Sequence, residues 1–254
     1  MFSDLSPEEL SQLVVIFSLL VPAALYAMGM MEGRHSHRYF LAGMAAHGLT
    51  IVHRAFSIGG VPLTEKHDNV SFLAFAMAAL SWYYLRRKGA REITITAVPM
   101  ASITVMAALA FPVINTVSPF MRSPWFTLHM AFFFASYAFF GISACLGLVY
   151  VRGGGVDAEA LQYRTAAYGW TLYTISLVLG SIWFFVAYGM YWLWTSKELW
   201  TTLTWFFYGM YLHQRYIKGI SGIMAAMVGI AGFFIALFAY FGVGTVIPAP
   251  PVQF

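Results

Sequence analysis

The sequence predicts an all-α protein, a polytopic bundle of about eight membrane-crossing helices with both termini on the outer side. Of its 254 residues, 60% are hydrophobic and only 9% are charged, whereas soluble domains carry roughly 25% charged residues. Such a chain has too few solvating side chains to cover a water-facing surface, so its solvent must be lipid. This composition excludes a soluble enzyme, a nucleic-acid-binding protein and a disordered chain.

Eight apolar stretches are long enough to span a bilayer, which requires roughly 17 to 25 helical residues. No repeat of fixed period is evident, so inverted halves of the transporter type are not expected. We expect residues 1–254 to form one integral membrane domain. The predicted spans are 10–31, 39–57, 70–85, 93–114, 124–151, 165–188, 199–217 and 220–247.

The first three spans each have a specific justification. Residues 1–10 are polar and acidic where a signal peptide would be basic, so the first span is expected to be a retained helix. The second span carries two histidines. The third is the shortest, and it is kept because Trp82, Tyr83 and Tyr84 can form an interfacial collar while the following cations snorkel.

The remaining spans are apolar and, like the first three, carry no acidic residue. This argues against a proton-driven or cation-driven transporter, which usually needs an intramembrane carboxylate. The fifth span holds the single cysteine, Cys145, which we expect to be a small buried residue. One cysteine excludes a disulfide framework and covalent haem attachment. The glycine run 153–155, with Asp157 and Glu159, is predicted to be a plain inner linker.

The positive charges give the predicted orientation. With eight spans, the odd-numbered connections hold ten of the 14 Lys and Arg residues. By the positive-inside rule these connections lie in the cytoplasm, which places both termini outside. The net charge of +4 then needs no anionic macromolecular partner. We expect an integral protein of a bacterial cytoplasmic membrane.

Four histidines fall within the predicted spans, where ionisable residues are costly and are presumed functional. A helical rise of 1.5 Å per residue places His53 and His129 about 6 and 7 Å below the outer surface, and His47 and His213 about 15 and 20 Å below it. They form an outer and a deeper pair. Because six residues separate them, His47 and His53 point about 120° apart and must face different neighbours.

Paired imidazoles from facing helices are the usual axial ligands of a b-type haem. The sequence therefore predicts one or two haem b groups, with the cation of Arg54 placed to pair with the haem propionates. The alternative is that each histidine hydrogen-bonds a neighbouring helix as a structural contact.

The tryptophans are unevenly distributed. Five of the eight lie between residues 183 and 205, around one predicted outer loop. An interfacial aromatic belt would be spread over all helix ends, so this segment is a second candidate functional feature.

These residues resemble the CcsA/ResC/CcmC type of cytochrome c assembly protein, whose hallmark is a tryptophan-rich outer segment called the WWD domain. The WWD-like segment covers residues 180–205, and a Tyr-Leu-His-x-Arg motif follows it. Weaker matches lie at Arg54, Pro62-Leu63, Asp68 and the segment 124–129. The residues that match in order and spacing are Gly180, Trp183, Gly189, Tyr191, Trp192, Trp194, Lys197, Glu198, Trp200, Trp205, Tyr211, Leu212, His213 and Arg215.

The resemblance implies that His129 holds haem against the WWD surface for attachment to an apocytochrome, and that His213 ligates a haem within the membrane. Two departures stand out, because Thr195 replaces the Asp of the motif and the chain stops before the second outer histidine. We predict that His53 replaces that ligand opposite His129, and that His47 completes the site of His213. The aromatic surface would comprise Trp183, Trp192, Trp194 and Trp200.

Two functions from different classes follow. The first is a haem-handling subunit of cytochrome c maturation, with an apocytochrome at the outer face and a membrane partner subunit. The second is a self-contained di-haem cytochrome that passes electrons between quinol and an outer c-type cytochrome. A membrane scaffold that has lost haem is a third.

Overall fold

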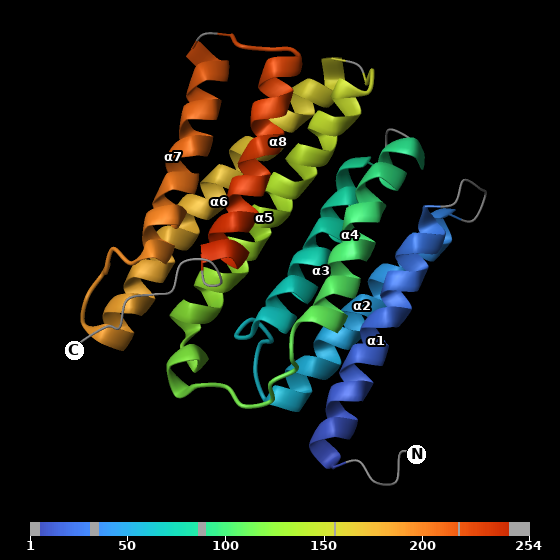
Figure 1. Cartoon of the computed structure of the whole chain (residues 1–254), viewed down its shortest axis with the longest axis vertical. Coiled ribbons are helices and arrows are strands. Elements are labelled where there is room, and N and C mark those ends of the chain that lie inside the picture. Colours follow the sequence, from blue (N-terminus) through green and yellow to red (C-terminus); the bar gives the residue numbers. More distant parts are fainter. Residues whose placement is uncertain (1–5, 31–35, 86–89, 155, 218, 244–254) are drawn as a thin grey trace. The chain divides into compact units, whose positions relative to one another are not determined.

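A computed structural model describes residues 6–30, 36–85, 90–154, 156–217 and 219–243 (Figure 1). Within these ranges the regular structure is entirely helical, which confirms the predicted all-α class. Two short helical turns are not α-helical: a 3-10 helix at Pro119–Arg122 and a π-helical turn at Phe238–Gly242. The α-helices are α1 Pro7–Gly29, α2 Ser36–Ile58, α3 Lys66–Leu85, α4 Ala90–Ala110, α5 Pro124–Val151, α6 Val156–Tyr188, α7 Ser196–Ile217 and α8 Ile223–Leu237.

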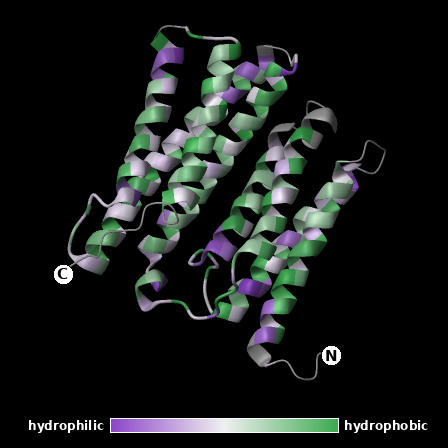
Figure 2. Cartoon of the chain, in the orientation of Figure 1, coloured by the Kyte–Doolittle hydropathy of each residue, from purple (hydrophilic) through white to green (hydrophobic). Residues whose placement is uncertain are grey.

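Four of these helices are long and apolar enough to cross a membrane: Glu9–Gly29, Pro124–Val151, Asp157–Tyr188 and Ile223–Gly242. Figure 2 shows hydrophobic residues along the helices. The chain is thus an integral membrane protein, while eight crossings and outer termini stay predictions. Two of these helices begin before the predicted spans and so include Glu9, Asp157 and Glu159 at their starts.

Polar residues that cap or enter a helix explain where the predicted boundaries differ. The hydroxyl of Ser6 accepts from the Glu9 N–H at 3.3 Å, and the Glu9 carboxylate accepts from the Ser6 N–H at 2.8 Å. This capping box starts α1 before residue 10. Helix α6 begins at Val156 rather than 165, so Asp157 and Glu159 lie in its first turn. The predicted plain linker is therefore wrong for these two residues.

Close packing divides the chain into two compact units, Met1–Ser123 and Pro124–Phe254, which we call unit 1 and unit 2. In unit 1, α1 packs against α2 and α4, and α3 packs against α4 and α2. In unit 2, α5 packs mainly against α6 and α8, while α7 contacts α6 and α8. We describe each unit by itself, and the single membrane domain stays a prediction.

One face of α2 carries the core of unit 1. Its buried residues recur at alternating spacings of three and four, which is the pattern of a helix with one buried stripe. A Cβ atom at Gly43 would lie 2.9 Å from the Tyr26 ring, so this glycine permits the close approach of α1. Three of the buried side chains, those of His47, Thr50 and Arg54, are polar and occupy core positions. The buried positions are Phe40, Gly43, His47, Thr50, Arg54 and Ile58.

Aromatic side chains fill the core of unit 2. The rings of Phe140 and Tyr208 stack with centroids 3.7 Å apart, and Phe133 stacks on Tyr137 at 4.4 Å. The Tyr137 hydroxyl donates to the Ala236 carbonyl at 2.8 Å and so ties α5 to α8. Cys145 is a free buried thiol, as predicted.

Candidate functional site

His129 lies in the second turn of α5, where two hydrogen bonds fix it to α6. Its Nδ1 is 2.8 Å from the Ser176 carbonyl oxygen, and the Ser176 hydroxyl donates to the His129 carbonyl at 3.0 Å. A carbonyl oxygen only accepts, so Nδ1 must carry the proton and Nε2 keeps its lone pair. A backbone carbonyl that accepts from one ring nitrogen, and so orients the imidazole, is typical of metal-ligating histidines.

Gly180, one turn after Ser176, makes room for this imidazole. A Cβ atom at position 180 would lie 2.7 Å from Nδ1 and 2.8 Å from Cε1 of His129. Any larger residue would displace the ring from α6. The close approach gives a physical reason for the first glycine of the WWD-like segment.

Trp183 extends the same face toward the helix end. Its ring packs against Phe126, with centroids 4.9 Å apart. Phe126 lies three residues before His129 on α5, and Trp183 lies three after Gly180 on α6. Helices α5 and α6 thus pack antiparallel. His129 on α5 and Trp183 on α6 lie about one turn apart along the pair.

The connection between α6 and α7 carries two tryptophans in unusual settings. Trp194 has a φ of 56°, a left-handed backbone conformation that bulky residues rarely adopt. The buried Nε1 of Trp192 has no hydrogen-bond partner among the described residues, and an unpaired buried donor is costly. The two rings meet edge to face at 6.0 Å. Such features favour a binding role, since strain and unpaired polar groups cluster at ligand sites.

Thr195 lies immediately before α7, at the position where the family motif has Asp. Its hydroxyl bonds to the carboxylate of Glu198, three residues later. The Thr-x-x-Glu spacing is that of a capping box, in which Thr and Asp both serve as the capping residue. The departure from the motif therefore preserves the helix start, although it removes the carboxylate.

The other tryptophans of the segment have structural partners. Trp200 packs edge-on against Phe238 at 4.7 Å. Trp205 stacks with Trp170 at 5.3 Å and donates from Nε1 to the Thr174 hydroxyl at 2.8 Å. Neither Trp170 nor Thr174 belongs to the predicted segment, and no sequence signal distinguished them from other residues of an apolar span.

His213 is exposed on α7, and an ion pair anchors the helix end just beyond it. Arg215 donates to Glu159 at 2.9 Å, and the same carboxylate oxygen accepts the Gly222 N–H at 2.8 Å. Glu159 thus joins α6, α7 and the turn that begins α8. Sequence reasoning missed this role, because a charged residue beside three glycines is typical of a loop.

His47 and His53 have contrasting environments in unit 1. His47 is fully buried, and both ring nitrogens are engaged, with Tyr26 Oη at 3.2 Å and with Ser71 Oγ at 2.9 Å. These bonds favour the structural alternative and leave no lone pair free for haem iron. His53 lies on the exposed side of the same helix.

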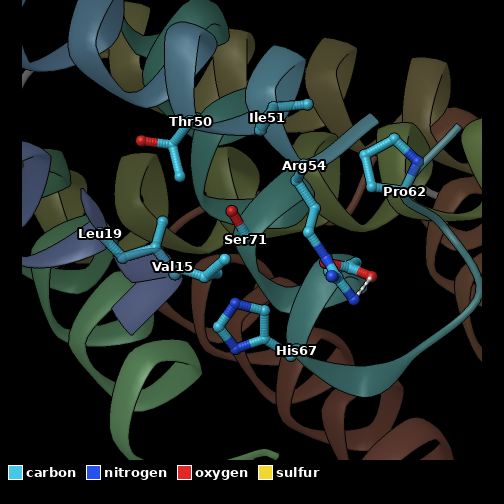
Figure 3. Close-up of a pocket in the computed structure, with 9 residues that line it drawn as sticks. Val15, Leu19, Thr50, Ile51, Arg54, Pro62, His67 and Ser71 are labelled. Carbon is cyan, nitrogen blue, oxygen red and sulfur yellow. Dashed lines mark hydrogen bonds and ion pairs between the residues drawn. The ribbon is translucent and has the colours of Figure 1, made fainter. Parts of the chain in front are cut away.

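Arg54 is also buried, and it occupies an ion pair rather than an open site (Figure 3). Its Nε donates to Asp68 at 2.8 Å, and it also donates to Asn115 Oδ1 and the Ile114 carbonyl. The predicted pairing with propionates therefore has no support, because four of the five guanidinium N–H groups are engaged within unit 1. Nearby Glu65 has its pKa raised by burial and by the charge of Asp68, against the opposing effect of Arg54.

The predicted ligand pairs, His53 with His129 and His47 with His213, each take one residue from each unit. They stay predictions, and the hydrogen bonds of His47 argue against the second. What the structure brings together within unit 2 is His129 with Ser176, Gly180 and Trp183.

Comparison with known proteins identifies relatives for most of the chain. The profile described as "Cytochrome C assembly protein" matches residues 64–248. The cytochrome c biogenesis protein CcsA of Pyropia yezoensis is 25% identical over 252 residues, covering 77% of this chain and 79% of the relative. CcsA of Prochlorococcus marinus (strain MIT 9312) is 26% identical over 226 residues, covering 73% of each.

A solved structure shares the fold. The cytochrome c haem lyase CcmF superposes with a TM-score of 0.65 and 13% identity over 94% of this chain. The alignment covers 48% of CcmF, so this chain corresponds to about half of that larger protein.

Proposed function

This chain belongs to the cytochrome c assembly protein family, and from that premise we propose that it binds haem b and presents it at the outer face of the membrane for cytochrome c maturation. The partners would be an apocytochrome on the outer side and a second membrane subunit. The haem is the group that maturation attaches to the apocytochrome.

The observation that carries this proposal is the state of His129. The Ser176 carbonyl holds Nδ1 in its protonated form, which leaves Nε2 as the coordinating atom. Gly180 allows the ring to sit against α6 without displacement. These residues prepare a neutral imidazole on a rigid pair of helices, as a haem ligand requires.

The aromatic segment fits the rest of a haem. Trp183 and Trp194 offer flat apolar surfaces, and the unpaired Nε1 of Trp192 is a donor that a propionate carboxylate would satisfy. Lys197 is exposed at the start of α7. Since the charge of Arg54 is paired with Asp68 in unit 1, Lys197 would supply the positive charge toward the propionates. An exposed binding surface of this kind suits a haem that is handed over.

A self-contained di-haem cytochrome is less well supported. It requires two bis-histidine sites in one chain, and the two hydrogen bonds on His47 remove the ligand proposed for the inner one. We therefore keep haem handling as the conclusion.

The test is haem content and cytochrome c maturation measured in parallel. The protein is purified, reduced-minus-oxidised spectra and pyridine haemochrome stoichiometry are recorded, and each variant is assayed in a strain that lacks its own assembly subunit. We expect His129→Ala to lose haem and maturation, whereas His37→Ala, a control histidine at the start of α2, retains both. Wild-type protein without b-type haem, or full maturation with His129→Ala, would contradict the proposal.

A further inference from the structure

Unit 1 contains a buried strip of polar side chains that the proposed haem site in unit 2 does not use. The strip runs along the core face of α2 and the first turns of α3, and each of its members is at most 7% exposed. Ionisable and polar groups are expensive inside a membrane protein and are presumed functional there. The members are His47, Thr50, Arg54, Asp68 and Ser71.

The inner part of the strip is a three-residue hydrogen-bonded chain. Tyr26 Oη contacts His47 Nδ1 at 3.2 Å, and His47 Nε2 contacts Ser71 Oγ at 2.9 Å. Hydroxyl groups both donate and accept, so either neutral tautomer of His47 satisfies both partners. A proton can therefore be exchanged at the ring of His47 through Ser71, with one proton entering and one leaving by the same hydroxyl, so that no net charge is moved and Tyr26 keeps its proton.

The outer part of the strip is the Arg54–Asp68 ion pair with His67. The Nδ1 of His67 is 2.8 Å from the Ala107 carbonyl, which holds this ring against α4. Arg54 uses four N–H groups on Asp68, Asn115 and the Ile114 carbonyl, which leaves one of its five for another partner within the described residues.

A small cavity separates the two parts (Figure 3). It leaves about 10 Å³ for the centre of a water molecule, which is about the space that one buried water needs. Its polar lining brings together the Ser71 hydroxyl of the inner part and the groups of the outer part. The lining residues are Val15, Leu19, Thr50, Ile51, Arg54, Pro62, His67, Asp68 and Ser71.

We propose that this cavity binds one water molecule, and that the water completes a continuous hydrogen-bonded path from Asp68 through Ser71 to His47, along which the ring proton of His47 exchanges. The available groups match water, which donates two hydrogen bonds and accepts two. Asp68 offers acceptors, while Ser71 and the remaining N–H of Arg54 offer donors. This inference does not rest on haem binding.

The path opens toward one end of unit 1. At its outer end, Arg54 contacts Asn115, which lies in the connection after α4. At its inner end, Tyr26 is fully buried and packs against the buried ring of Phe40, with centroids 5.5 Å apart. Protons thus reach the middle of unit 1 from the end at which Asn115 lies, while the apolar ring of Phe40 closes the opposite end.

The test is deuterium exchange at the ring of His47, followed by NMR of the full chain in lipid bilayers with ¹⁵N-labelled histidine. We expect the ring N–H of wild-type His47 to exchange with D₂O faster than the backbone amides of α2 around it. Ser71→Ala breaks the path and is expected to slow this exchange about tenfold, since one hydrogen-bonded link is lost. Ser81→Ala is the matched control, because Ser81 is also a buried serine on α3. Its hydroxyl bonds to Met77 and Met100, away from the path.

A conservative variant and an experimental structure complete the test. Ser71→Thr retains the hydroxyl and is expected to exchange like wild type, which separates loss of the path from a general loss of folding. An experimental structure in lipid should show water density between Ser71 and Asp68. A dry cavity, or equal exchange rates in Ser71→Ala and Ser81→Ala, would overturn the proposal.

Discussion

Gly180→Ala tests the geometry of the candidate haem ligand with a single methyl group. The new Cβ would lie 2.7 Å from His129 Nδ1, whereas ordinary contacts begin near 3.4 Å, so the ring must move by about 0.7 Å. Ser176 lies on the same helix as Gly180. Displacement away from α6 would therefore stretch the 2.8 Å bond to Ser176 toward about 3.5 Å, where a hydrogen bond is lost.

Three contributions determine how much Gly180→Ala changes the free energy of unfolding. Overpacking costs about 1 to 3 kcal/mol, and loss of the hydrogen bond adds about 1 kcal/mol. The higher helix propensity of alanine offsets about 1 kcal/mol. We expect a net loss of about 1 to 3 kcal/mol in the free energy of unfolding. Haem affinity should fall about 10- to 100-fold, as when a metal-ligating histidine loses the hydrogen-bond partner of its other ring nitrogen.

The assay is haem titration by absorbance, with thermal unfolding measured on the same samples. Gly209→Ala is the control in unit 2, because its Cβ would meet its nearest neighbour, Trp170 Nε1, at an ordinary 3.5 Å. It should bind haem as wild type does. If Gly180→Ala also keeps wild-type affinity, the contact between Gly180 and His129 does not position the ligand.

Three other contacts, each within one unit, can be tested by substitution. Arg54→Met leaves Asp68 buried without its partner and should lower the free energy of unfolding by about 3 to 5 kcal/mol; a double variant with Asp68→Leu should recover much of this loss in a thermal melt. Thr195→Val should lower the free energy of unfolding by about 1 kcal/mol, because the residue before α7 can no longer cap the helix. Thr195→Asp should melt like wild type. Equal melting temperatures of the two variants would refute the capping role. Glu159→Arg and Arg215→Glu should each impair cytochrome c maturation, and the reciprocal double variant should restore part of it, unless the pair contributes nothing to the position of α7.

Sequence periodicity could have predicted part of the site in unit 1. His47 and Arg54 are seven residues apart and share the three-and-four spacing of Phe40, Gly43 and Ile58, which identifies one core-facing stripe. His53 lies off this stripe, and it is exposed. Depth alone, which paired His53 with His129, says nothing about the direction in which a helix presents a side chain.

The partners of polar residues could not be predicted in the same way. Glu159 follows a glycine run and has the local context of a loop residue. It is buried because Arg215 and Gly222, more than 50 residues later, meet it in space. Likewise, Ser176 is one of many small polar residues in apolar helices, and only its contact with His129 gives it a role.

The sequence by itself determined the solvent, the helical class and the family, because these depend on composition, on the length of apolar stretches and on the spacing of motif residues such as Trp183 and His213. The tertiary structure decided which histidine has a free lone pair. Hydrogen bonds from Tyr26 and Ser71 occupy both nitrogens of His47, whereas the Ser176 carbonyl holds His129 in the tautomer that leaves Nε2 available. Such a distinction depends on atoms that are close in space and distant along the chain, so no local pattern in the sequence contains it.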